Sequence, residues 1–204
     1  MQKKLSLLKP GFTQTFSFKV ILLTTIILVS FFVQSSIAQT VTNITTKDST
    51  TIKVVTSEKA KYPKTVGYLS FILPLETLQG SKTTGNFGAA TSIGFPVGIN
   101  VLYSDHFGFS YEFTPTIKST NSTSKTSNLL FDPGTMFRFD GGFTIITRLA
   151  FETEGRYGFT PVFNQIYART KYVNYFVALS LPNRFGDGEA YSLGLNLQLG
   201  FIFN

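Results

Sequence analysis

The sequence predicts an all-β protein, a transmembrane antiparallel up-and-down β-barrel of eight strands. Large apolar residues occupy every odd position from Tyr191 to Phe203, and small or polar residues occupy the even positions except Ile202. A period of two over this length is typical of one β-strand with two chemically different faces. Its polar face carries Ser, Gly, Asn and Gln but no Lys, Glu or Arg, unlike the water-facing side of a soluble sheet. Apolar residues outward and polar residues inward are the pattern of a transmembrane barrel strand.

The charged residues are the second observation. Five of them fall on the small and polar face of the predicted strands: Glu112, Asp132, Arg138, Arg148 and Glu152. A charge that faces lipid at mid-depth costs about 2–4 kcal/mol for Arg, so a membrane barrel needs this segregation. After the first apolar run, the sequence has no run of 18 apolar residues. Because backbone polar groups must be paired in lipid, only a closed barrel then remains as a spanning structure.

The first 38 residues resemble a cleaved export signal. Four lysines and no acid precede the apolar run 20–33, and Ser36-Ile37-Ala38 is a small-x-small cleavage pattern. The alternative is a single membrane anchor, but the run is shorter than the ~20 residues that a spanning helix needs. The cleavage site has no Cys for a lipid anchor. We therefore predict a signal peptide at 1–38 and export to the cell outer membrane.

The residues after the predicted signal are enough for one domain. Without the four lysines of the signal, 14 basic residues stand against 11 acidic ones. This mild surplus is not a nucleic-acid signature, and the lack of Cys excludes disulfides and thiolate metal sites. The Thr- and Lys-rich segment 39–64 is interpreted as a periplasmic linker, and residues 65–204 as the barrel.

The first four strands are predicted where alternation is clear. They span residues 65–75, 87–103, 107–118 and 129–139. Their apolar faces carry Leu69, Phe71 and Leu73; Ile93, Phe95, Val97 and Ile99; Phe109, Tyr111 and Phe113; Phe131, Phe137 and Phe139. The polar segments Glu76 to Asn86 and Ser119 to Asn128 are predicted as long loops. Tight turns are predicted at residues 104–106 and 140–142.

The last four strands follow the same rule. They span residues 143–152, 157–167, 172–182 and 191–203, and a Gly-rich turn near 185–189 precedes the last. With an even number of strands, the first and the last strand begin and end on the same side of the membrane, which we predict to be the periplasmic side. An aromatic layer is expected at that end: Tyr103, Phe107, Phe139, Phe143, Tyr167, Tyr172, Phe201 and Phe203.

Six prolines fall inside these strands, where a closed barrel has no edge strand to tolerate them. They are Pro74, Pro96, Pro115, Pro133, Pro161 and Pro182. We predict that the hydrogen-bond ladders end or bulge at these positions.

The chain resembles the small outer-membrane β-barrel proteins of Gram-negative bacteria, the eight-stranded class of the OmpA membrane domain and OmpX, in a form common among Bacteroidetes-type bacteria. The resemblance covers residues 65–204 and depends on the signal, the alternation and the last strand. Gly200, Phe201 and Phe203 are similar to the signal read by the barrel-assembly machinery, although the chain ends in Asn204 rather than an aromatic residue. The resemblance implies a monomer surrounded by outer-membrane lipid, and it implies no particular activity.

Catalytic chemistry is not expected. The single His106 follows Asp105 in a tight turn and is interpreted as a solvated turn residue. No nucleophile elbow, phosphate loop or metal cluster is present, so we expect no cofactor and no metal. Glu112 and Glu152 are the remaining candidates for acid–base chemistry, and we assign them to structure instead.

An eight-stranded barrel has an interior just wide enough to be filled by side chains, and buried charges need partners. We therefore predict a lumenal polar network of Glu112, Asp132, Arg138, Arg148, Glu152, Asn100, Asn164, Asn196 and Gln198. The expected function is a structural or surface-interaction role of the outer loops, with a plugged lumen and no catalysis. Two alternatives stay open. One is a narrow channel or small-solute transporter, and the other is a secreted lipocalin-like barrel that binds an apolar ligand inside.

Overall fold

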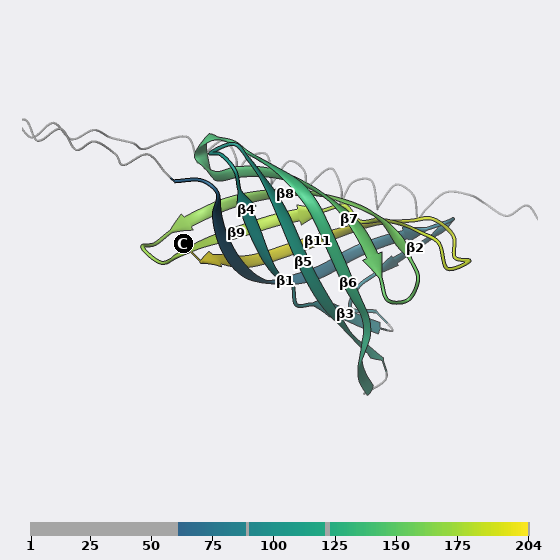
Figure 1. The fold of residues 1–204 in the computed structure, drawn as a ribbon. Coiled ribbons are helices and arrows are strands. Elements are labelled where there is room, and N and C mark those ends of the chain that lie inside the picture. Colours follow the sequence, from purple (N-terminus) through teal and green to yellow (C-terminus); the bar gives the residue numbers. More distant parts are fainter. Residues whose placement is uncertain (1–60, 89, 121–122, 204) are drawn as a thin grey trace, which may run out of the picture. The chain divides into compact units, whose positions relative to one another are not determined.

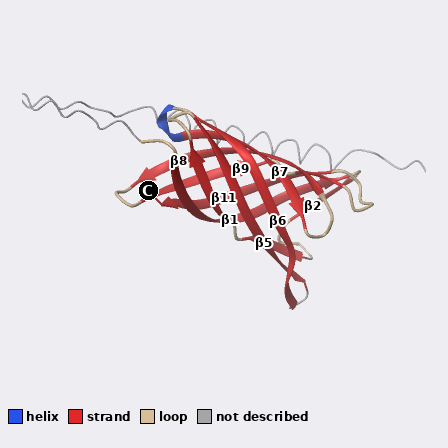
Figure 2. Ribbon diagram, viewed as in Figure 1, coloured by secondary structure: helices blue, strands red, loops and turns tan. Residues whose placement is uncertain are grey.

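The computed structural model describes residues 61–88, 90–120 and 123–203. The predicted signal peptide at 1–38 therefore lies outside the described residues, as does the predicted linker up to residue 60. The described chain is almost entirely strand, with one short 3₁₀ turn (Figure 2). Its elements are β1 (Lys64–Gln79), β2 (Lys82–Gly85), β3 (Ala90–Gly94), β4 (Val97–Leu102), β5 (Phe107–Thr120), β6 (Thr123–Arg138), η1 (Asp140–Gly142), β7 (Phe143–Glu152), β8 (Tyr157–Arg169), β9 (Val173–Ser180), β10 (Asn183–Phe185) and β11 (Ser192–Phe203).

These strands form one antiparallel sheet that closes on itself (Figure 1). β3 and β4 succeed one another between β1 and β5, and β2 pairs with the end of β1 beyond them. β9 and β10 share the position between β8 and β11. The eleven segments of the described chain thus occupy eight positions around the barrel. The seam is the pairing of β1 with β11, which runs from Tyr68 opposite Ile202 to Gln79 opposite Ser192. The predicted antiparallel barrel of eight strands is confirmed.

The two faces of the strands are chemically opposite, as the alternation predicts. On β5, Ser110, Glu112 and Thr114 are buried inside the barrel, whereas Tyr111 and Phe113 are exposed on its outer surface. The same alternation holds on β7, where Arg148 and Ala150 are buried and their neighbours are exposed. The buried face therefore carries the polar and charged side chains of these strands, together with an apolar cluster that includes Met136, Ile146 and Phe176.

The ladders break at three of the prolines. A bulge follows Pro74 in β1, Pro96 separates β3 from β4, and Pro182 separates β9 from β10. A proline has no N–H to donate, so a central strand bends or stops there.

At the other three prolines the pairing changes on one side. The β5–β6 register shifts just after Pro115, between Thr116 and Ile117. The β6–β7 ladder skips Asp132 and Pro133, and the β8–β9 ladder ends beside Pro161. The prediction that the prolines mark interruptions is confirmed.

Two predicted loops are wrong. Residues of the segment Glu76 to Asn86 extend β1 and form β2, and the segment Ser119 to Asn128 forms the paired ends of β5 and β6. These arms are rich in Thr, a residue that favours strands, and each arm pairs with its own hairpin partner. Both of their faces meet solvent, so no hydrophobic alternation marks them.

Two strand limits also differ from the prediction. The single strand expected at 87–103 is divided into β3 and β4, and the strand expected at 172–182 ends with β9 at Ser180. Strand β7 has the predicted limits, and the turns at 104–106 and 140–142 lie where they were expected. Among the described residues, no helix is long and apolar enough to cross a membrane.

Candidate functional site

The centre of the lumen holds a buried ion pair between β5 and β7. Arg148 Nη1 lies 3.1 Å from Glu112 Oε2. Both side chains are almost completely enclosed, with 3% and 1% of their residue surfaces exposed. Buried charges are stable only when they are paired and hydrogen-bonded, so the surroundings of this pair decide its contribution.

Tyr68 of β1 reaches across the lumen and joins both partners. Its hydroxyl donates to Glu112 Oε2 over 2.7 Å and accepts from Arg148 Nη2 over 3.0 Å. Arg148 Nη2 also donates to Ser110 Oγ, and Thr114 Oγ1 donates to Glu112 Oε1. The guanidinium further lies 6.0 Å from the centre of the Tyr68 ring, within the range of a cation–π contact.

A glycine makes room for this tyrosine. Gly98 of β4 is paired with Tyr68 on one side and with Glu112 on the other. A Cβ at Gly98 would lie 2.3 Å from atoms of the Tyr68 ring. The absence of a side chain therefore lets the ring lie flat over β4 and reach the ion pair.

Gln198 of β11 completes the cluster from the strand on the far side of β1. Its amide nitrogen donates to Ser70 Oγ over 2.8 Å and lies 3.5 Å from Glu112 Oε2. We call Tyr68, Glu112, Arg148 and Gln198 the central cluster. Its members come from β1, β5, β7 and β11, so it spans the lumen.

A second ion pair lies toward the end of the lumen at which β7 ends. Arg184 Nε of β10 lies 2.6 Å from Glu152 Oε1, and Arg184 Nη1 donates to Thr160 Oγ1. Arg156 lies beside this pair and donates to Ser192 Oγ over 2.9 Å and to the Arg184 carbonyl. Sequence reasoning places Glu152 in the lumen but misses its partner, because Arg184 follows the break at Pro182.

Asp132 is the predicted lumenal residue without a cation. It is buried directly opposite Glu112 in the β5–β6 pairing, and its Oδ1 has no hydrogen-bond partner. No guanidinium or ammonium of the described residues lies within ion-pair distance of it. Two carboxyl groups thus face one guanidinium at this level.

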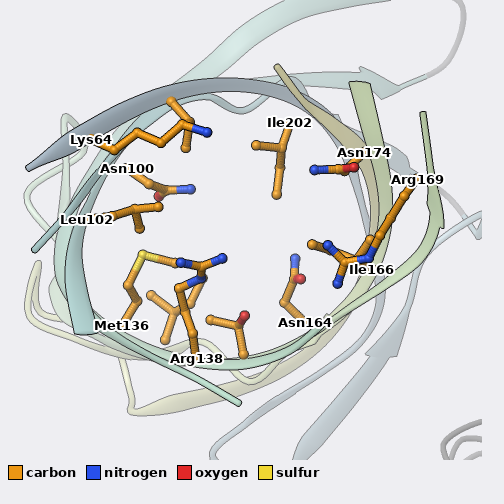
Figure 3. Close-up of a pocket in the computed structure, with 13 residues that line it drawn as sticks. Lys64, Asn100, Leu102, Met136, Arg138, Asn164, Ile166, Arg169, Asn174 and Ile202 are labelled. Carbon is orange, nitrogen blue, oxygen red and sulfur yellow. The ribbon is translucent and has the colours of Figure 1, made fainter. Parts of the chain in front are cut away.

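Three other predicted residues lie away from the central cluster. Arg138, Asn100 and Asn164 line a cavity at the end of the lumen where β1 begins and β11 ends (Figure 3). We call it the terminal cavity. Asn196, also predicted, is half-buried on β11 opposite Pro74 and Ser180.

The mouth of the terminal cavity is bordered by a short polar contact. The Tyr62 hydroxyl donates to Asp105 Oδ1, and this bond raises the pKa of Tyr62 above its ordinary value, whereas Arg138 nearby acts in the opposite direction. His106 is exposed, and its Nδ1 lies 3.2 Å from the Arg138 carbonyl. Among the described residues, no carboxylate accepts a hydrogen bond from the His106 ring to form a catalytic pair.

The residues of the predicted assembly signal lie on the closing strand. Gly200 is buried, and a Cβ there would lie 2.5 Å from the Leu69 carbonyl. The rings of Phe201 and Phe203 pack against each other with centroids 6.2 Å apart. Their role in assembly stays a prediction. No group of three metal-ligating side chains lies together in the described part of the chain.

Comparisons with known proteins give a likeness to solved structures but no sequence match. No protein-family model matches the sequence, and no curated protein matches it either. The solution NMR structure of the de novo designed protein TMB2.3 is similar to this chain with a TM-score of 0.39 and 12% identity, covering 68% of this chain and 94% of that one. At this level the likeness carries no argument, and the fold assignment depends on the strand pairing described above.

Proposed function

We propose that this chain is an integral outer-membrane β-barrel protein with a plugged polar lumen and a structural or surface-interaction role. The observation that carries the proposal is the inverted distribution of side chains. An ion pair with 3% and 1% exposure lies inside the barrel, while Phe113 and Leu149 are more than half exposed outside and large apolar side chains on the other strands are exposed as well. Water does not favour such an exterior, but lipid does.

The apolar exterior continues around the ring of strands. Large hydrophobic side chains are exposed on β1, β4, β5, β6, β7, β8, β9 and β11: Leu69, Phe71, Val97, Ile99, Tyr111, Phe113, Phe137, Leu149, Phe151, Phe159, Tyr175 and Leu199. Soluble monomers rarely carry contiguous apolar patches of more than a few hundred Å². An apolar belt on all sides matches a bilayer rather than a single protein partner.

The end of the barrel where β1 begins and β11 ends carries aromatic contacts. Tyr103 packs on Phe109, Phe107 on Phe137, Phe139 on Phe143, and Tyr167 on Tyr175. Aromatic residues favour the interface between lipid and water. Their position supports the proposal that this end lies at the periplasmic interface.

The central cluster supports a plugged lumen over the channel alternative. Side chains from four strands meet in it, and the interior of an eight-stranded barrel is only wide enough for such filling. The interior contains an apolar cluster that includes Met136, Ile146 and Phe176. The buried Glu112–Arg148 ion pair and the apolar exterior nevertheless disfavour the lipocalin-like alternative. We infer that the barrel neither conducts ions nor stores an apolar ligand.

The interaction surface is assigned to the hairpins at the other end of the barrel. β5 and β6 continue beyond the β6–β7 pairing as an arm that carries Lys118 and Lys125, and β3 pairs with the β5 side of this arm. Beyond Asn128, toward residue 123, β6 pairs with β5 alone. We propose that the protein is a monomer that meets the barrel-assembly machinery on insertion and an extracellular partner through this arm. It is not an enzyme in this proposal.

The test is fractionation of expressing cells, followed by electrophoresis of the outer-membrane fraction with and without boiling. We expect recovery in the outer membrane and a heat-dependent shift in mobility, which a folded barrel gives. The folded protein in a planar bilayer should give no conductance steps. The Arg148→Ala variant should be measured in the same bilayer for comparison. Recovery in the soluble periplasm without a mobility shift would contradict the membrane location, and open steps in the unmodified protein would contradict the plug.

A further inference from the structure

The terminal cavity is lined by three cationic side chains from three different strands. Lys64 begins β1, Arg138 ends β6 and Arg169 ends β8. In Figure 3 the labelled side chains of Lys64, Arg138 and Arg169 surround the lumen together with amide groups. Strands that are distant in sequence thus bring positive charge to one end of the barrel.

No carboxylate compensates these cations within the cavity. The lining contains no Asp or Glu, and no ion pair joins Lys64, Arg138 or Arg169 to an acid of the described residues. The nearest turns carry Asp105, which accepts from Tyr62, and the exposed Asp140; neither lines the cavity. Like charges near one another in a partly enclosed space attract an anion.

Amide groups add neutral donors to the same space. Asn100 and Asn164 are buried, at 5% and 7% exposure, and both line the cavity. The Oδ1 atom of Asn100 has no hydrogen-bond partner. Since the oxygen and nitrogen of an amide are interchangeable by a flip, Asn100 has spare capacity to bind a small polar guest, and its side chain points into the cavity (Figure 3).

The size of the cavity limits its guest. Its volume is about 90 Å³, and one water needs roughly 10–15 Å³ measured in the same way. The space holds a few waters or one small oxyanion. The central cluster closes the lumen beyond it, so the cavity is a blind-ended pocket and not a passage.

We propose that the terminal cavity is a binding site for a phosphate group, held by Arg138, Arg169 and Lys64 with Asn100 and Asn164 as neutral partners. Arginine suits this chemistry because its planar guanidinium donates two parallel hydrogen bonds to phosphate oxygens. The group has two possible sources, free phosphate in the periplasm and the headgroup of a phospholipid at the adjacent interface. The cation cluster itself is present wherever the barrel is located, so binding of free phosphate does not depend on the membrane proposal, whereas the headgroup source rests on it.

The experiment uses the full chain folded in dodecyl maltoside, a detergent without phosphate. Inorganic phosphate is titrated by calorimetry at constant ionic strength, and lysophosphatidylglycerol is added in a parallel series followed by ³¹P NMR. We expect one phosphate per barrel with a Kd of about 1 mM or tighter. Arg138→Gln and Arg169→Gln should each weaken binding by about tenfold or more, since each removes a charge-assisted hydrogen bond.

Lys118→Gln is the matched control, because it removes one exposed positive charge from the opposite arm and should leave the affinity unchanged. The heat-dependent gel shift confirms that each variant is folded, and Arg169 is exposed enough that its replacement should not disturb folding. Binding of phosphate in micelles assigns free phosphate as a source. Binding of the lysophospholipid alone, lost in Arg169→Gln, assigns the headgroup. Absence of both, or equal affinity in Arg169→Gln and Lys118→Gln, would overturn the proposal.

Discussion

The central cluster and the terminal cavity are two polar regions of one lumen with opposite electrostatic designs. In the cluster, Arg148 meets a carboxylate, a phenol and a serine hydroxyl, and almost no surface is left exposed. In the cavity, Arg138 faces amides and two further cations, and no carboxylate lines the space. The inward position of a charge on a barrel strand therefore does not define its role; the level along the barrel axis does.

The same alternation of inward and outward side chains can therefore supply both the residues that close the lumen and the residues that could bind a ligand. Glu112 lies at the level where Tyr68 crosses the lumen, so its carboxylate is fully paired inside the central cluster. Arg138 lies at the strand end, where the lumen opens and its partners can come from outside. Four substitutions test this contrast, in decreasing order of expected effect.

The largest effect is expected from Arg148→Leu. It leaves Glu112 buried without its cation, and breaking a buried pair costs about 3–5 kcal/mol of unfolding free energy. The matched change Arg138→Leu removes an arginine without an ion pair and should cost less than about 1 kcal/mol. Urea unfolding in lipid vesicles, followed by the gel shift, measures both. Equal losses would show that the two regions do not differ.

Gly98→Ala should give the next largest loss. The new Cβ would collide with the Tyr68 ring, which must then leave its hydrogen bond with Glu112. Overpacking of this kind costs about 1–3 kcal/mol. Gly85→Ala on β2 is the control, since a Cβ there finds its nearest atom 4.0 Å away. A Gly98→Ala protein as stable as the control would contradict the packing of Tyr68 over β4.

Asp132→Asn should change stability in the favourable direction. It removes one of two facing carboxyl groups that share a single guanidinium, and it keeps the shape of the side chain. We expect a gain of about 1 kcal/mol in the same unfolding experiment. Glu112→Gln provides the contrast, because it removes the partner of Arg148 and should destabilise the barrel. Two changes of the same sign would show that Asp132 is itself part of the ion pair.

The smallest effect is expected from Tyr62→Phe at the mouth of the terminal cavity. The hydrogen bond to Asp105 is largely exposed, so its loss should cost only about 0.5 kcal/mol. Because this bond raises the pKa of Tyr62 above 10.0, its contribution is complete below pH 10 and is lost as the pH rises through the raised value. Unfolding of both proteins at pH 8 and at high pH measures the difference. A difference that grows with pH would contradict the assignment of the hydroxyl as donor.

Alternation predicted the faces of the barrel correctly because lipid-facing and lumen-facing positions differ in polarity along each strand. It located β7 to the residue, since the strand Phe143–Glu152 is limited by tight turns at both ends. It failed on the arms at 76–86 and 119–128, where both faces meet water and polarity carries no period. There, hairpin pairing and the strand preference of Thr decide the structure.

The lumenal residues were predictable in position but not in partnership. The sequence placed Glu112 and Arg148 on one face, and the structure brings them within 3.1 Å. It gave no reason to join Glu152 to Arg184, because the chain between them includes two turns and a break. Tyr68 was not included in the predicted network, although a tyrosine on the inward face of a strand, opposite a glycine, was a usable signal. The terminal cavity depends on how the strand ends meet around the ring.

The seam between β1 and β11 has a consequence for the order of assembly. The other pairings join strands that are adjacent or only a few strands apart in the chain, but Tyr68 and Ile202 meet across almost the whole described sequence. Contacts of such long separation form slowly, because the loop must be closed before the contact is gained. Until β11 is in place, β1 and β9 each offer an open edge to other chains. The hydrogen bond from Gln198 to Ser70 then links the two seam strands from inside the barrel, so β11 both closes the ring and is held there by a lumenal side chain.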